Sequence, residues 1–174
     1  MIENILVLDI ESTGLDAKKH KCIEVGAVLF NIPHRTILQQ FSTLFPCDEN
    51  PVEDINNIKP AATQATYSHH YWDVHFMTMV HSSQAIVAHN AQFDKKFIDE
   101  FNLNILSPWI CTKNDFEWPV NLPRKRLQDV CEAMGISYDK SHRALADCMF
   151  IIDCFGKLDD LESRLQLALE KAIR

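Results

Sequence analysis

The sequence predicts an α/β fold in which helices flank a mixed five-stranded sheet that opens with an antiparallel meander. Two observations predict this fold. Three β-prone apolar segments follow one another near the N-terminus, and strands then alternate with amphipathic helices. Because the chain has 174 residues and an apolar fraction of 47%, it is long enough to bury a sizeable core as one domain.

The first three strands are expected over residues 5–11, 22–32 and 36–45. The first is a run of apolar residues that ends at a Ser-Thr-Gly turn. The second closes at a Pro-His-Arg turn, and the third alternates between apolar and polar side chains. Since only short connections separate these strands, we expect them to pair as an antiparallel meander.

Strands and helices alternate in the rest of the chain. Residues 46–60 are polar and turn-rich and are expected to form a loop, whereas 61–83 shows a mostly helical pattern. Two short apolar segments, 85–88 and 108–112, are expected to be the last strands. The remaining expected helices are 93–101, 127–134 (stopped by Gly135), 141–158 and the tail 159–174.

The tail is amphipathic. It carries apolar side chains at helical spacing, at Leu161, Leu165, Ala168 and Ala172. With only four glycines and seven prolines in the chain, no stretch is typical of a flexible linker. The sequence therefore predicts a main domain over 1–157 and a C-terminal helix over 158–174, which belongs to that domain or docks onto a protein partner.

Composition narrows the class of protein. No segment has the length or flanks of a membrane span or a secretory signal, so we expect a cytoplasmic protein with no membrane contact. The six cysteines form no CxxC pair and are expected to be buried, reduced thiols. A net charge of −7 argues against a protein that coats nucleic acid through a basic face. It does not argue against an enzyme whose active site is built from carboxylates and binds divalent cations.

Two carboxylates lie on the first expected strand. Asp9 and Glu11 are two residues apart, and residues two apart on a strand point to the same face. Burying bare carboxylates in an otherwise apolar strand is costly unless something neutralises them, and bound metal ions do so. The alternative is that residues 9–11 merely form the polar end of the strand.

Asp94 is the next candidate. It ends the segment 89–94, which follows a four-residue buried strand and opens a helix. Open α/β sheets gather their ligands at the carboxyl ends of their strands, so a functional carboxylate fits this position. The alternative is that Asp94 only stabilises the helix start through the helix dipole.

His142 and Asp147 lie at the start of the helix expected over 141–158. Residues five apart on a helix are separated by about 140° around its axis, so these side chains do not share one stripe. We expect Asp147 to face the other carboxylates and His142 to lie at the N-terminal edge of the helix. The alternative is a capping histidine beside an incidental acid.

Taken jointly, these segments resemble a known family. Asp9–Leu15, Val87–Asp94 and His142–Asp147 resemble the three motifs of the DEDDh exonucleases, also called DnaQ-like, which include the proofreading subunit of bacterial DNA polymerase III. Trp109–Thr112 and Leu127–Gly135 resemble the parts between those motifs. The resemblance covers nearly the whole chain and implies the ribonuclease H-like fold, in agreement with the predicted sheet.

The resemblance implies metal-dependent hydrolysis of phosphodiester bonds. Two divalent cations are implied, and oxygen-only ligands favour Mg²⁺ or Mn²⁺ over zinc. A histidine would be the general base that deprotonates the attacking water, so we expect the rate to fall at mildly acid pH, where an imidazole is protonated. The implied catalytic set is four metal-binding carboxylates and this base: Asp9, Glu11, Asp94, Asp147 and His142.

Contacts to the substrate are implied as well. Leu15 would wedge beside the terminal base, and its alternative role is core packing. The basic cluster 124–126 would contact a phosphate upstream of the scissile bond, and its alternative is a solvated loop. The full set of expected substrate-binding residues is Ser12, Thr13, Leu15, Asn90, Arg124, Lys125 and Arg126.

These expectations lead to one main hypothesis and two rivals. The main hypothesis is a 3′→5′ exonuclease that releases nucleoside 5′-monophosphates from single-stranded ends of DNA, as a proofreading subunit of a polymerase or as a separate trimming enzyme. DNA is favoured because the segment 89–94 is more like the polymerase-associated members. The rivals are an RNA-trimming enzyme similar to RNase T or oligoribonuclease, and an inactive module that binds a partner through the tail.

Overall fold

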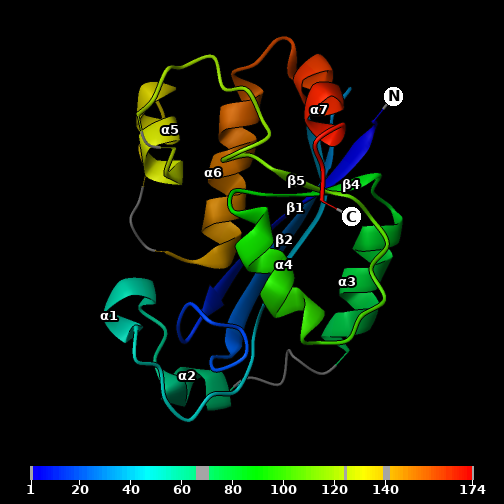
Figure 1. Cartoon of the computed structure of the whole chain (residues 1–174). Helices are drawn as coiled ribbons and strands as arrows, with labels where there is room; N and C mark the ends of the chain where they lie inside the picture. Colours follow the sequence, from blue (N-terminus) through cyan, green and yellow to red (C-terminus); the bar gives the residue numbers. More distant parts are fainter. Residues whose placement is uncertain (1, 66–70, 124, 139–141, 174) are drawn as a thin grey trace.

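A computed structural model describes residues 2–65, 71–123, 125–138 and 142–173 (Figure 1). The chain forms a five-stranded sheet in the order β3-β2-β1-β4-β5. The strands are β1 (Asn4–Ser12), β2 (Cys22–Asn31), β3 (Thr36–Leu44), β4 (Ala85–Ala88) and β5 (Trp109–Cys111). β1, β2 and β3 pair antiparallel, whereas β4 pairs parallel with both β1 and β5. The predicted mixed sheet with an opening meander is confirmed.

Helices cover both faces of the sheet because its central strands are apolar on both faces. In β1, Leu6 and Leu8 pack with α3 (Trp72–His81) and α4 (Ala91–Asp99). The alternating residues Ile5 and Val7 pack on the opposite face. The helices of that face are α5 (Leu127–Ala133), α6 (Ala144–Gly156) and α7 (Leu161–Leu169), and Figure 1 shows both layers.

The region between β3 and β4 differs from the prediction. The expected loop over 46–60 contains a short helix, α1 (Glu53–Asn56), and the start of α2 (Pro60–Gln64). The helix expected over 61–83 is divided into α2 and α3, and residues 66–70 lie outside the described residues. Helices of four or five residues are too short to produce a periodic pattern, so the sequence could not reveal them.

The tail packs against the main body. α7 buries its apolar side chains, Leu161, Leu165 and Ala168, in the same core as α5 and α6. Beyond α7, Ile173 forms an antiparallel bridge with Trp109 through two backbone hydrogen bonds of 2.8 and 2.9 Å. The tail therefore extends the edge of the sheet next to β5, which the helical pattern did not predict.

All six cysteines are buried and free, as predicted. The closest thiols belong to Cys131 on α5 and Cys154 on α6, whose Sγ atoms are 3.7 Å apart. Among the helices that the structure describes, none combines the length and apolar character needed to span a membrane.

Candidate active site

The predicted carboxylates come together at the carboxyl ends of β1 and β4. Asp9 and Glu11 project from β1 toward the face that α6 covers, and Asp147 lies in the first turn of α6. One carboxylate oxygen from each of these three residues lies within 4.8 Å of the others. Asp94 joins them from the first turn of α4, which begins soon after β4 ends.

These residues line one cavity of about 380 Å³. His142 also lines it, so the cavity contains all five residues of the predicted catalytic set. The other lining residues are Ile10, His89, Asn90, Phe93, Lys113, Arg126, Leu127, Gln128 and Tyr138.

Burial disfavours the charged forms of the four carboxyl groups, and repulsion by neighbouring carboxylates adds to this effect at Asp9, Glu11 and Asp147. Burial, and then the neighbouring carboxylates, raises the pKa of Asp9 well above its ordinary value. Burial is also the largest cause at Glu11, where the pKa rises to about 9, at Asp94, where it rises to about 7, and at Asp147, where it rises to about 6. Oxygen ligands gathered at such a cost suit a bound divalent cation, which would remove the repulsion.

Glu24 on β2 is an acid of the site that sequence reasoning missed. Its side chain is only 1% exposed and stands opposite Glu11 in the strand register. The carboxylate accepts bonds from Arg143 Nε at 2.9 Å and Nη2 at 2.7 Å, from the Ala144 amide at 3.1 Å, and from the Ser42 hydroxyl at 2.9 Å. It therefore caps α6 and ties the start of that helix to the sheet.

His142 is placed differently from the prediction. α6 begins at Ala144 rather than near residue 141, so His142 precedes the helix and its angle to Asp147 does not follow the helical period. Its φ of +44° lies in the left-handed region, which is uncommon for a large side chain. The next residue, Arg143, is held by Glu24, and this long-range pair rather than helical periodicity determines where the segment lies.

Gly26 allows α6 to approach the sheet. It pairs with Asp9 in the register of β1 and β2. A Cβ atom at Gly26 would lie 2.3 Å from the Leu145 amide nitrogen and 2.5 Å from the Ala144 carbonyl carbon. The start of α6 therefore lies directly over this glycine, which brings Asp147 close to the carboxylates of β1.

Tyr138 is a further residue that the sequence did not reveal. Its hydroxyl donates a 3.0 Å hydrogen bond to Asp147 Oδ1, and its side chain lines the acidic cavity. Burial and the charge of Asp147 raise the pKa of Tyr138, so the phenol stays protonated as a donor. A lone tyrosine before a helix has no motif that would mark it, and its role depends on the fold.

The expected substrate-binding residues lie in different surroundings. Asn90 is exposed and lines the acidic cavity. Leu15 is 87% exposed, so core packing is excluded for it. Ser12 and Thr13 are buried, and their hydroxyls bond within their own loop, to the Gly14 carbonyl at 2.7 Å and to the Lys21 amide at 3.0 Å respectively.

The basic cluster is only partly described. Arg126 lines the acidic cavity, whereas Lys125 lines a neighbouring one. The Asp129 carboxylate accepts hydrogen bonds from the Arg126 amide at 3.2 Å and from Arg126 Nη2 at 2.6 Å at the start of α5. Arg124 lies outside the described residues.

A family model described as an exonuclease, RNase T, matches residues 6–155. The chain belongs to this exonuclease family. The match includes every residue of the predicted catalytic set, and the resemblance to the DEDDh exonucleases is confirmed. Exonucleases of the DEDDh family use divalent metals, and this chain has the acidic cluster in which such ions would bind.

Individual relatives agree with this assignment. This chain is 31% identical over 156 residues to a DNA polymerase III of PolC type from Clostridium perfringens, with 83% of the chain covered. It spans only 10% of that polymerase. It is also 26% identical to the DNA polymerase III subunit epsilon of Treponema pallidum, with 84% of this chain and 72% of the subunit covered.

Solved structures confirm the fold. The nuclease domain of 3′hExo, a DEDDh family member bound to rAMP, superposes with a TM-score of 0.72 at 15% identity. The superposition covers 99% of this chain and 97% of that domain. The chain therefore has the ribonuclease H-like fold that the resemblance implied.

Proposed function

We propose that this protein is a metal-dependent 3′→5′ exonuclease that hydrolyses single-stranded ends of DNA to nucleoside 5′-monophosphates. One observation carries the proposal: four carboxylates, of which Asp94 and Asp147 are buried and Asp9 and Glu11 half-buried, line a single cavity with a histidine in a chain of the exonuclease family. The relatives named as DNA polymerase III components favour DNA over RNA.

We propose two divalent cations, Mg²⁺ or Mn²⁺, as cofactors. Asp9, Glu11 and Asp147 present carboxylate oxygens close together, and Asp94 adds a fourth acid to the same cavity. Their oxygen-only donor set and their raised pKa values fit hard cations. When bound, the cations would supply the positive charge that stabilises the phosphate during displacement.

His142 is proposed to take the proton of the attacking water. Its backbone is held beside the carboxylates by the Glu24–Arg143 pair, and its side chain lines their cavity. A base must lie within hydrogen-bond reach of the proton it removes, so this position suits the role. The neutral imidazole, which has a free lone pair on one ring nitrogen, is the form that accepts this proton.

Further residues are proposed to hold the terminal nucleotide. Exposed Leu15 would lie beside its base, and Asn90 would bond its sugar or phosphate. Because the hydroxyls of Ser12 and Thr13 already bond within their loop, only their backbone groups are proposed to contact the nucleotide.

We also propose that the main domain over 1–157 and the tail over 158–174 form one structural unit, located in the cytoplasm. The buried apolar side chains of α7 and the bridge from Ile173 to Trp109 support this unit. A polymerase is the proposed partner, because the curated relatives are polymerase III components. The proposed contact with that partner uses the exposed side of the tail, where Leu167 is 55% exposed.

The direction and substrate can be tested with matched 20-nucleotide strands of DNA and RNA, each blocked at the 5′ or the 3′ end. We expect stepwise release of mononucleotides from DNA in Mg²⁺ or Mn²⁺. A 3′ block should stop this release, whereas a 5′ block should have no effect. If only the RNA strands are cleaved, the substrate is RNA and not DNA. Release of mononucleotides from strands with a blocked 3′ end would contradict the proposed 3′→5′ direction.

The metal-free protein is expected to lose stability as the pH rises. A carboxyl whose pKa is raised on folding binds more protons when folded, so its contribution is complete below its ordinary value near 4. That contribution is lost as the pH passes about 6 for Asp147, about 7 for Asp94 and about 9 for Glu11. Saturating Mg²⁺ should weaken this dependence, because the cation takes the place of the protons.

Thermal denaturation in chelator and in Mg²⁺, at pH values from about 5 to 9, measures this effect. We expect the melting temperature in chelator to fall across the range and the increment produced by Mg²⁺ to grow. A metal-free melting temperature that rises steadily with pH would show that the carboxylates are not held in repulsive proximity.

A further inference from the structure

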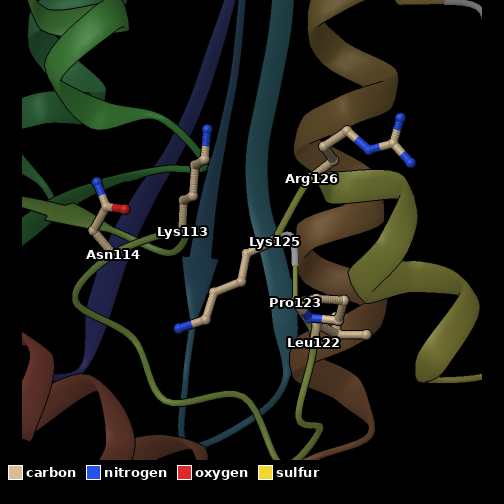
Figure 2. A pocket seen from close by; sticks show the side chains of 6 residues that line it. All are labelled: Lys113, Asn114, Leu122, Pro123, Lys125 and Arg126. Atoms are coloured by element: carbon tan, nitrogen blue, oxygen red, sulfur yellow. The ribbon is translucent and has the colours of Figure 1, made fainter.

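A second cavity, of about 520 Å³, has the opposite charge character to the acidic one. Among its lining residues that the structure describes, three are cationic and none is acidic. In a chain with a net charge of −7, such a local concentration of cations indicates an anionic ligand. This basic pocket is lined by Lys113, Asn114, Leu122, Pro123, Lys125 and Arg126 (Figure 2).

The basic pocket adjoins the proposed active site. Lys113 and Arg126 line both cavities, so the two share a wall. Figure 2 shows Lys113 and Asn114 on the segment that follows β5, and Lys125 and Arg126 on the segment that precedes α5. The side chain of Arg126 points away from that of Lys125, consistent with only Arg126 of the two reaching the acidic cavity.

A buried histidine connects the two segments that form the pocket. His89 Nε2 lies 2.7 Å from the Lys125 carbonyl, and its Nδ1 lies 2.9 Å from the Thr112 hydroxyl. Since a carbonyl only accepts, Nε2 carries the proton and Nδ1 accepts from Thr112. Burial lowers the pKa of His89 to about 4, so the ring stays neutral near pH 7 and the connection persists. The pocket is therefore held in shape before any ligand binds.

The three cationic side chains of the pocket differ in whether an acidic side chain pairs with them. Arg126 is paired with Asp129 through Nε at 2.9 Å and Nη2 at 2.6 Å. Within the part of the chain that the structure describes, Lys113 and Lys125 form no side-chain ion pair. Their ammonium groups are therefore the cations that an incoming anion meets uncompensated.

We propose that the basic pocket binds the backbone phosphate of the nucleotide next to the one being removed, in a single strand of DNA or RNA. This inference rests on the proposed function, which puts the scissile phosphate at the carboxylates. Lys113 and Lys125 would bind phosphate oxygens, and Leu122 and Pro123 would offer apolar surface to the sugar or base. Such contacts position a strand without reading its sequence.

The test is direct binding of a six-nucleotide single strand that carries a fluorophore at its 5′ end, in the presence of Mg²⁺. Binding is measured in the Asp9→Asn background, where we expect no cleavage. The Lys113→Gln/Lys125→Gln change should raise Kd by about tenfold or more, because two charge-assisted contacts are lost. The slope of log Kd against log salt should fall by about 0.7 for each lost phosphate contact.

Lys157→Gln is the matched control, because Lys157 is an exposed lysine at the far end of α6. If the double change weakens binding no more than Lys157→Gln does, the inference is wrong. Parallel DNA and RNA strands show which polymer the pocket accepts. Competition by a nucleoside 5′-monophosphate that disappears in the double variant would make the pocket a product site and overturn the inference.

Failure of the inference can be distinguished from failure of the proposed function. Loss of strand binding in the pocket variant with normal cleavage of free 3′ ends by the wild type supports both. A wild type that binds strands through the pocket but cuts none contradicts the function alone. Melting temperatures of the variants within about 1 °C of their parent would show that the lysine changes leave the fold intact.

Discussion

Replacing Asp9 by Asn is expected to abolish cleavage while raising the melting temperature of the metal-free protein. The amide keeps the size of the side chain but removes a charge that would hold a cation. Loss of one preorganised group that stabilises charge lowers the rate by about 10²–10³-fold, and we expect at least that loss here. Cleavage should be compared with the wild type across Mg²⁺ and Mn²⁺ concentrations.

The stability of the same variant should change in the opposite direction. Burial and the neighbouring carboxylates raise the pKa of Asp9, so at neutral pH its charge works against folding when no cation is present. Asn removes that repulsion from Glu11, Asp94 and Asp147. Each kcal/mol relieved corresponds to about 2–4 °C in melting temperature for a protein of this size.

Asp159→Asn is a control of matched chemistry, because Asp159 is exposed and lies in the turn before α7. It should leave both the rate and the melting temperature unchanged. Wild-type cleavage by Asp9→Asn with every cation tried would exclude Asp9 from the machinery. A lowered melting temperature in chelator would show that its carboxylate is not repelled in the folded state.

Replacing Gly26 by Ala is expected to destabilise the protein and reduce cleavage together. The added methyl group would meet backbone atoms of Ala144 and Leu145 at 2.3–2.5 Å, and backbone cannot rotate away as a side chain can. Overpacking of this kind costs about 1–3 kcal/mol, and occasionally more. Any relaxation has to move the start of α6, and with it His142 and Asp147.

Gly156→Ala is the matched control for this change. Gly156 lies at the other end of α6, where a Cβ atom would meet nothing within 4 Å. Alanine favours helix over glycine, so this variant should be as stable as the wild type or more so, with normal cleavage. Thermal denaturation and the rate at saturating metal give both readouts. Normal values for Gly26→Ala would show that α6 can shift without affecting the site.

Local patterns explain why much of the fold was predictable. Alternation and apolar runs identified all five strands, because one strand needs only a few residues to display its period. Asp9 and Glu11 could be recognised as candidates because two carboxylates on one face of an apolar strand are costly to bury unless something neutralises them. The short helices α1 and α2 were missed because four or five residues carry no period.

The sequence by itself predicted the sheet from its strand pattern, and the resemblance of its motifs indicated the family and the candidate acids Asp9, Glu11, Asp94 and Asp147. Tertiary structure alone decided that Glu24 caps α6, because its partner Arg143 lies 119 residues away. It also decided that His142 precedes the helix with a positive φ and that Lys113 joins Lys125 in one pocket. These features depend on contacts between distant segments, and packing determines such contacts where local periodicity cannot.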